Sequence, residues 1–143
     1  MIKSSFFGEV DAPDGGVHLM DGGMHGVQGH TIEAPPRGPW RWERRLDGMQ
    51  PRGKAGDGQL DPAEQERQQL FAWTESAWQL APSGKADFFE FPPTVPRWVW
   101  CIVIRRGAEV RILQGGGVTW GSEPKELAPL LEWLRERVDQ LSG

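Results

Sequence analysis

Four residues with metal-binding side chains lie within thirteen positions near the start of the chain: His18, Asp21, His25 and His30. Imidazole and carboxylate groups are ligands that zinc accepts. Their spacing fits neither one face of a helix nor a zinc knuckle, and glycines surround them. We therefore predict no bound metal and no cofactor, and keep a small enzyme or metal-dependent protein centred on this segment as an alternative.

A second pattern, DGQLDPAE from Asp57 to Glu64, matches the later half of an EF-hand calcium loop followed by a helix. In the complete loop the first and third ligands would be Gly53 and Ala55, which carry no side-chain oxygen. An Asp-Gly turn before a capped helix explains the same residues. We expect this segment not to bind calcium.

Groups that could act as nucleophiles are few. The sequence contains neither a G-x-S-x-G elbow nor a Walker motif. Its one cysteine, Cys101, lies in the most apolar segment, where a buried and inert thiol is expected. The glycines at 115–117 lack the lysine and the helix start of a phosphate-binding loop. These observations predict a protein that is not an enzyme.

Large apolar side chains within glycine-rich segments indicate a different role, which is contact with another protein. Met20 and Met24 lie in one such segment and Trp120 in another. Each side chain could anchor in a partner's pocket or fold back onto its own sheet. The chain has 8 tryptophans, and one small core does not easily hold them all, so we expect part of the tryptophan at the surface.

Length and charge limit the classes of protein, partner and compartment that fit this sequence. A chain of 143 residues can bury a core without disulfides. Its 16 basic and 20 acidic residues are mixed along the sequence and give a net charge of -4, which does not favour nucleic acid. The first residues lack the apolar core of a secretory signal, and no stretch is long enough for a membrane helix. We expect a cytoplasmic protein, a monomer or weak dimer, whose partner is a protein.

The C-terminal third indicates the architecture most clearly. Residues 97–105 (RWVWCIVIR) are apolar on both alternating faces, which predicts a central strand covered on both sides. A tight turn at Arg106-Gly107 and a strand over 109–114 follow, then a flexible glycine-rich loop over 115–121. Residues 127–141 carry leucine or valine at helical spacing and predict an amphipathic helix that packs on the sheet.

The preceding part of the chain is less regular. Residues 1–39 are rich in glycine and proline and predict short strands joined by turns such as Asp14-Gly15-Gly16 and Asp21-Gly22-Gly23. Residues 40–46 suit a half-exposed strand in which Arg44 breaks the alternation, and 47–60 a mobile surface loop.

Asp61 is a candidate N-cap for a helix over 62–80. Phe71 and Trp78 widen the apolar stripe of this helix. An aromatic segment over 87–93 ends in two prolines. We therefore predict a single α+β domain over residues 1–143, with an antiparallel sheet of four or five strands and two helices packed against it.

The order of these motifs resembles a family of small bacterial proteins, the protealysin inhibitors typified by emfourin. The family pattern is an S-G-G-F-A-G-[IL] segment, a helix, an F-F-x-L-P segment, a hairpin and a closing helix of the form L-x-P-L-L-x-W-L. This chain has DGGMHGV at 21–27, DFFEFP at 87–92 and LAPLLEWL at 127–134. The resemblance spans residues 21–138, with Asp21, Met24 and His25 in place of Ser, Phe and Ala.

The resemblance implies a compact α+β inhibitor that binds a thermolysin-like zinc metallopeptidase and contributes no catalysis. With the two glycine-rich segments, it leads us to expect partner contacts from Gly22, Gly23, Met24, His25, Gly26 and Trp120. An immunity-like or assembly-partner protein that binds another protein through a Trp-rich surface is the alternative.

Overall fold

The computed structural model describes residues 2–5, 7–23, 26–47, 54–89, 98–117 and 123–142. These residues form an α+β fold, as predicted. The elements, in chain order, are β1 (Ile2–Ser4), β2 (Gly8–Val10), β3 (Gly16–Gly23), β4 (Gly26–Glu33), β5 (Trp40–Asp47), β6 (Gly56–Leu60), α1 (Glu64–Gln79), β7 (Lys85–Phe89), β8 (Trp98–Arg106), β9 (Glu109–Gly117) and α2 (Ala128–Ser142).

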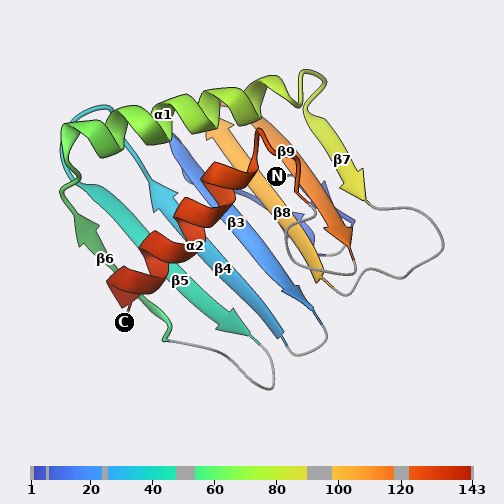
Figure 1. The fold of residues 1–143 in the computed structure, drawn as a ribbon, viewed down its shortest axis with the longest axis horizontal. Helices are drawn as coiled ribbons and strands as arrows, with labels where there is room; N and C mark the ends of the chain where they lie inside the picture. Colours follow the sequence, from blue (N-terminus) through green and yellow to red (C-terminus); the bar gives the residue numbers. More distant parts are fainter. Residues whose placement is uncertain are drawn as a thin grey trace.

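The main sheet is larger than the four or five antiparallel strands that the sequence predicted. It has seven strands in the order β6-β5-β4-β3-β8-β9-β7, and β1 and β2 form a separate two-stranded sheet (Figure 1). Neighbouring strands of the main sheet run antiparallel except β7, which runs parallel to β9. The sheet is therefore mixed.

The prediction for the β8–β9 hairpin is confirmed. Strand β8 lies between β3 and β9, and Gly107 in the connecting turn has a φ of +62°, which glycine adopts without strain. Trp100, Ile102 and Ile104 belong to the core on one face of the sheet, whereas Cys101 and Val103 belong to a second apolar cluster on the other. Both faces of this strand are covered, as its sequence predicted.

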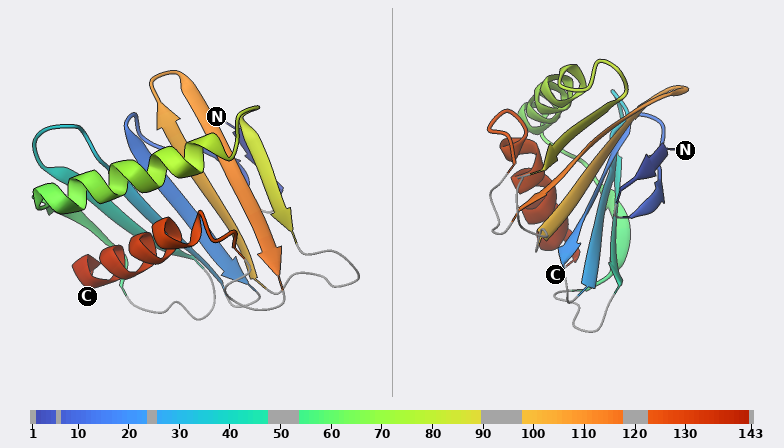
Figure 2. Two further views of the ribbon diagram at one scale, coloured as in Figure 1. Left: turned by 45° about the horizontal axis from the view of Figure 1, so that its top comes forward. Right: turned by 90° about the vertical axis from the view of Figure 1, so that its right-hand side faces the viewer.

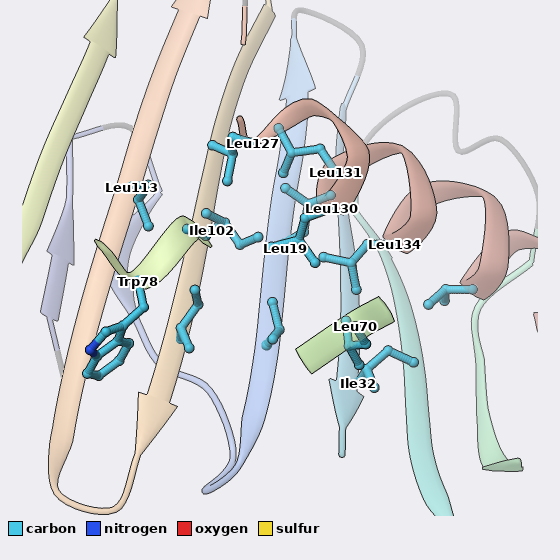
Figure 3. Packing of buried hydrophobic residues seen from close by; sticks show 14 of the residues in the cluster. Leu19, Ile32, Leu70, Trp78, Ile102, Leu113, Leu127, Leu130, Leu131 and Leu134 are labelled. Carbon is cyan, nitrogen blue, oxygen red and sulfur yellow. The ribbon is translucent and has the colours of Figure 1, made fainter. Parts of the chain in front are cut away.

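Both helices lie on one face of the main sheet, and the β1–β2 hairpin lies on the other (Figure 2). The leucine stripe of the closing helix is confirmed, since α2 and the residue before it bury Leu127, Leu130, Leu131, Leu134 and Val138 completely. Figure 3 shows the labelled leucines of α2 directed at Leu19, Ile32 and Ile102 of the sheet. This is the main core of the molecule.

Several predictions for the N-terminal half are wrong in their boundaries. Asp21, Gly22 and Gly23 are not a turn but the end of β3, which pairs with β4 over eight residues. The proposed loop over 47–60 contains β6, which pairs with β5. Gly115, Gly116 and Gly117 are the last residues of β9 and pair with β8 and, for two of them, β7. A glycine-rich composition hid β6 and the last residues of β3 and β9.

The first helix lies close to its predicted range, but its start differs. Its N-cap is Ala63, with no side-chain cap, and Asp61 instead accepts a hydrogen bond from Arg67 at 3.4 Å. Leu70, Ala77 and Trp78 are buried, whereas Phe71, which was expected to widen the apolar stripe, is 68% exposed and does not belong to it. No helix among the described residues is long and apolar enough to cross a membrane.

Six of the seven described tryptophans lie in or against the main core. Four of them, Trp40, Trp42, Trp78 and Trp100, are buried. The other three, Trp73, Trp98 and Trp133, are partly buried, and the indoles of Trp40, Trp73 and Trp133 form an aromatic cluster between α1, α2 and β5. Part of the tryptophan therefore reaches the surface, although none of the described tryptophans is fully exposed, and the Trp-rich binding surface of the alternative stays a prediction.

Candidate protein-binding edge of the sheet

The hairpin of β3 and β4 turns between Gly23 and Gly26, which pair with each other at the end of the two strands. A side chain at Gly22 would place its Cβ 2.3 Å from the carbonyl oxygen of Gly26, a distance that forbids any residue but glycine without a shift of the backbone. Gly26 has a φ of +141°, which L-residues with side chains rarely adopt. Glycine is thus required at this turn by its geometry.

The strand ends beside this turn lie in one row. Gly23 pairs with both Gly26 and Trp98, and Trp98 pairs with Gly117, so these four residues cross four adjacent strands. The β3–β4 turn and the segment that follows β9 therefore start at the same end of the sheet (Figure 1). We name this end, defined by Gly22, Gly23, Gly26, Trp98 and Gly117, the glycine edge.

Three of the six residues predicted to contact a partner, Gly22, Gly23 and Gly26, belong to the glycine edge. The other three, Met24, His25 and Trp120, lie outside the described residues. Gly23 and Gly26, which flank Met24 and His25, belong to this edge, and so does Gly117, which lies three residues before Trp120. The predictions for the side chains themselves stay predictions.

A buried ion pair lies two residues before the turn. Asp21 is 1% exposed, and its Oδ2 accepts a hydrogen bond of 2.5 Å from Nε of Arg135 in α2. Nη2 of Arg135 also lies 3.0 Å from Oε1 of Glu123, whose side chain is almost fully buried. One arginine thereby ties the end of β3 to the last helix and to the residue that leads into it.

A second buried arginine supports the same region. Arg44, the residue that broke the alternation of the fifth strand, is 4% exposed and faces α2. It donates hydrogen bonds to Oε1 of Gln28 at 3.0 Å and to the hydroxyl of Ser142 at 3.2 Å, and it pairs with Asp139. These polar partners explain why a charged residue, rather than an apolar one, occupies this buried position.

The surroundings shift the pKa values of two groups in this region. Burial raises the pKa of Asp21 above its ordinary value, and the Arg135 cation opposes that rise. Burial lowers the pKa of His30 to about 4, and the Arg44 and Arg135 cations act in the same direction. His30 is therefore neutral at pH 7, and its ring lies among the polar groups beneath α2.

The two described histidines that were considered for a metal site, His18 and His30, do not converge. His30 is opposite Leu19 in the β3–β4 ladder and faces the helices, whereas His18 is opposite Thr31 on the other face. Nδ1 of His18 lies 2.7 Å from the Thr31 hydroxyl. Among the described residues, no group of three or more His, Cys, Asp or Glu side chains is arranged to hold a metal ion.

The structure also shows where the EF-hand-like pattern and the single cysteine lie. Asp57, Gly58 and Gln59 of the EF-hand-like pattern are paired residues of β6 rather than part of a loop. Cys101 is fully buried, as predicted, and burial raises the pKa of its thiol to about 12. Such a thiol is not an available nucleophile at neutral pH.

Sequence reasoning missed the pairing of Arg135 with Asp21 and Glu123, and the contacts of the buried Arg44 with α2. One signal existed: Arg135 lies four residues after Leu131 and three before Val138, so it borders the apolar stripe of the last helix. A charged residue there needs a buried partner, but the sequence does not identify Asp21 as that partner.

No protein-family model matches this chain, and a search of the curated proteins finds no match. The resemblance to the protealysin inhibitors therefore stays a prediction, based on the order of the motifs.

Proposed function

We propose that this protein is a protein-binding module that inhibits a thermolysin-like zinc metallopeptidase through the glycine edge. The single observation that carries the proposal is the position of the β3–β4 turn. It lies at the end of two eight-residue strands, beside the end of β9, where backbone and loop residues can meet a partner together.

The described strand ends on both sides of the turn are held in place, which supports a binding role. Binding is weakened when flexible groups must be ordered, so strand ends that are fixed before contact keep more of their interaction energy. Here the ion pair between Asp21 and Arg135 anchors β3 two residues before the turn, and the close approach of Gly22 to the Gly26 carbonyl leaves little room for rearrangement.

The glycines of the edge also suit close contact by the main chain, because no side chain holds the partner away. Between them the sequence offers Met24, a flexible apolar side chain of the kind that enters hydrophobic pockets of many shapes. The resemblance to the protealysin inhibitors adds the class of target, a peptidase with an apolar specificity pocket.

A non-enzymatic role fits the placement of the described reactive groups. His18 and His30 face opposite sides of the sheet, and the Cys101 thiol is buried with a pKa of about 12. None of these three groups shares a site with another of them. An inhibitor needs no such site.

The experiment is a titration of a thermolysin-like peptidase with the purified protein while casein hydrolysis is followed. We expect inhibition at micromolar concentration or below, with the protein still intact by mass spectrometry after the assay. Rapid cleavage of the protein would mean that it is a substrate. If no such peptidase is inhibited, including one encoded beside it, a pull-down with a tagged copy from its native cell would test the interaction-partner alternative.

A further inference from the structure

The sheet face opposite the helices carries a groove of about 1130 Å³. Its floor is formed by residues of β3, β4 and β5, and it reaches β6 at the sheet edge. One wall is the β1–β2 hairpin together with the segment Asp11–Pro13 that leads into β3. The groove lies on the face of the sheet, whereas the glycine edge lies at its end.

The groove exists because the small hairpin covers only part of this face. Val10 and Ala12 pack on Cys101, Val103 and Ile112, which belong to β8 and β9. The strands β4, β5 and β6 lie beyond this cluster, on the other side of β3 (Figure 2). In the described residues, no element covers their outward side chains.

Carboxylates outnumber cations among the side chains that line the groove. Six acidic residues line the groove, against two arginines, Arg41 and Arg45: Glu9, Asp11, Glu33, Glu43, Asp47 and Asp57. Asp11 is paired with Arg105, and Glu43 with Arg45. His18 adds no positive charge at pH 7, because burial, followed by the nearby Arg45 cation, lowers its pKa. The groove therefore has an excess of negative charge.

Two of these carboxylates face each other across neighbouring strands, which is electrostatically unfavourable. Glu43 of β5 and Asp57 of β6 are directly opposite each other in the antiparallel ladder, on the groove side. Like charges at directly opposed positions destabilise a sheet. Arg45 pairs with Glu43 and offsets part of this repulsion, and a cation bound between the two carboxylates would remove the rest.

The groove also offers apolar surface. Phe7, Met20 and Val27 line it and are only partly buried. A ligand that fits both kinds of surface carries positive charges beside apolar groups. A concave site with one sign of charge also attracts an oppositely charged partner over a distance.

We propose that this groove binds a lysine- and arginine-rich polypeptide segment of a partner protein that also carries apolar side chains. The Glu43–Asp57 pair receives a basic side chain, and Phe7, Met20 and Val27 contact the apolar ones. The site is independent of the glycine edge and does not require that the protein be a peptidase inhibitor.

The test is calorimetric titration of the full protein, at about 0.15 M ionic strength, with a peptide of alternating lysine and leucine. A peptide of alternating glutamate and leucine serves as the charge control. We expect saturable binding of the first peptide only. The double variant Glu43→Gln/Asp57→Asn should weaken this binding about tenfold or more, since it removes the opposed carboxylates.

The matched control is Glu132→Gln/Glu136→Gln, which removes two exposed carboxylates from α2, on the other face of the sheet. It should change the affinity less than about twofold. The variant Arg41→Gln should tighten binding, because it removes a positive charge from the groove. Absence of binding, equal weakening by both double variants, or weaker binding by Arg41→Gln would each overturn the proposal. Thermal melting of each variant verifies that it is folded.

Discussion

Asp21 and Arg135 form a buried ion pair between the third strand and the last helix, with Nε of Arg135 2.5 Å from Oδ2 of Asp21. The pair lies directly behind the β3–β4 turn. It holds together two segments that are 114 residues apart in the sequence, and the position of the glycine edge depends on both of them.

Replacing Arg135 by methionine should destabilise the protein by about 3–5 kcal/mol at neutral pH, because it leaves the buried Asp21 carboxylate without its cation. In the variant the folded-state pKa of Asp21 rises further above its unfolded value. Asp21 then favours folding below its unfolded pKa and loses that effect as the pH rises through the folded pKa. The loss should therefore be smaller at about pH 4, as measured by urea unfolding.

The control for this variant is Arg137→Met on the same helix. Arg137 pairs with Glu66, and both side chains are partly exposed, so its removal should cost no more than about 1 kcal/mol. Equal losses for the two variants, with the same pH dependence, would contradict a special role for the Asp21–Arg135 pair.

Substitution Gly22→Ala should destabilise the protein by about 1–3 kcal/mol, since the new Cβ would lie 2.3 Å from the Gly26 carbonyl oxygen. Gly29→Ala in the neighbouring strand is the matched control. There the nearest atom, Cε1 of His18, is 3.4 Å away, and we expect no loss in urea unfolding. If Gly22→Ala were as stable as Gly29→Ala, the turn would not have the geometry described.

Leu134→Ala should destabilise the protein by about 2–5 kcal/mol, because Leu134 is completely buried between α2 and the sheet. The measurement is the free energy of unfolding in urea. A loss below about 1 kcal/mol would mean that this face of α2 is not packed on the sheet.

Acidification should weaken the fold through His30. Its folded pKa of about 4 lies below the ordinary histidine pKa of 6.5, so its contribution to stability is present above the unfolded pKa and is lost as the pH falls through the folded pKa. The pKa difference of His30 corresponds to about 3 kcal/mol in the free energy of unfolding. The variant His30→Gln should lose less stability between about pH 7 and pH 4 than the natural protein, measured by urea unfolding at both values. Identical pH profiles would show that His30 titrates normally.

The sequence predicted those elements whose burial follows a local period. Strand β8 and helix α2 are apolar at strand and helix spacing, so their packing could be anticipated. The last residues of β3 could not be anticipated, because Asp21 and Gly22 interrupt the apolar pattern of the strand. Asp21 pairs with Arg135, and Gly22 leaves room for the Gly26 carbonyl. The sequence does not show either contact, because only the fold brings these groups close.

Strand β6 was missed for a similar reason. Its sequence GDGQL is that of a loop, yet a Cβ at Gly58 would lie 2.9 Å from Nε1 of Trp42. The glycine permits the buried indole of β5 to pack against its neighbour. The candidate site was likewise only partly predictable. Its glycines were recognised from their motif, but the single row of Gly23, Trp98 and Gly117 depends on pairings between strands that are distant in the sequence.

The most direct test of the proposed function is the inhibition constant against a thermolysin-like zinc peptidase, compared for the natural protein, Met24→Asp and Phe71→Asp. Phe71 is an exposed apolar residue of α1, outside the glycine edge, and is the matched control. We predict that Met24→Asp weakens inhibition by about 2 kcal/mol or more, roughly thirtyfold, while Phe71→Asp changes it little. Inhibition that both substitutions reduce equally, or that Met24→Asp leaves unchanged, would contradict binding through the glycine edge.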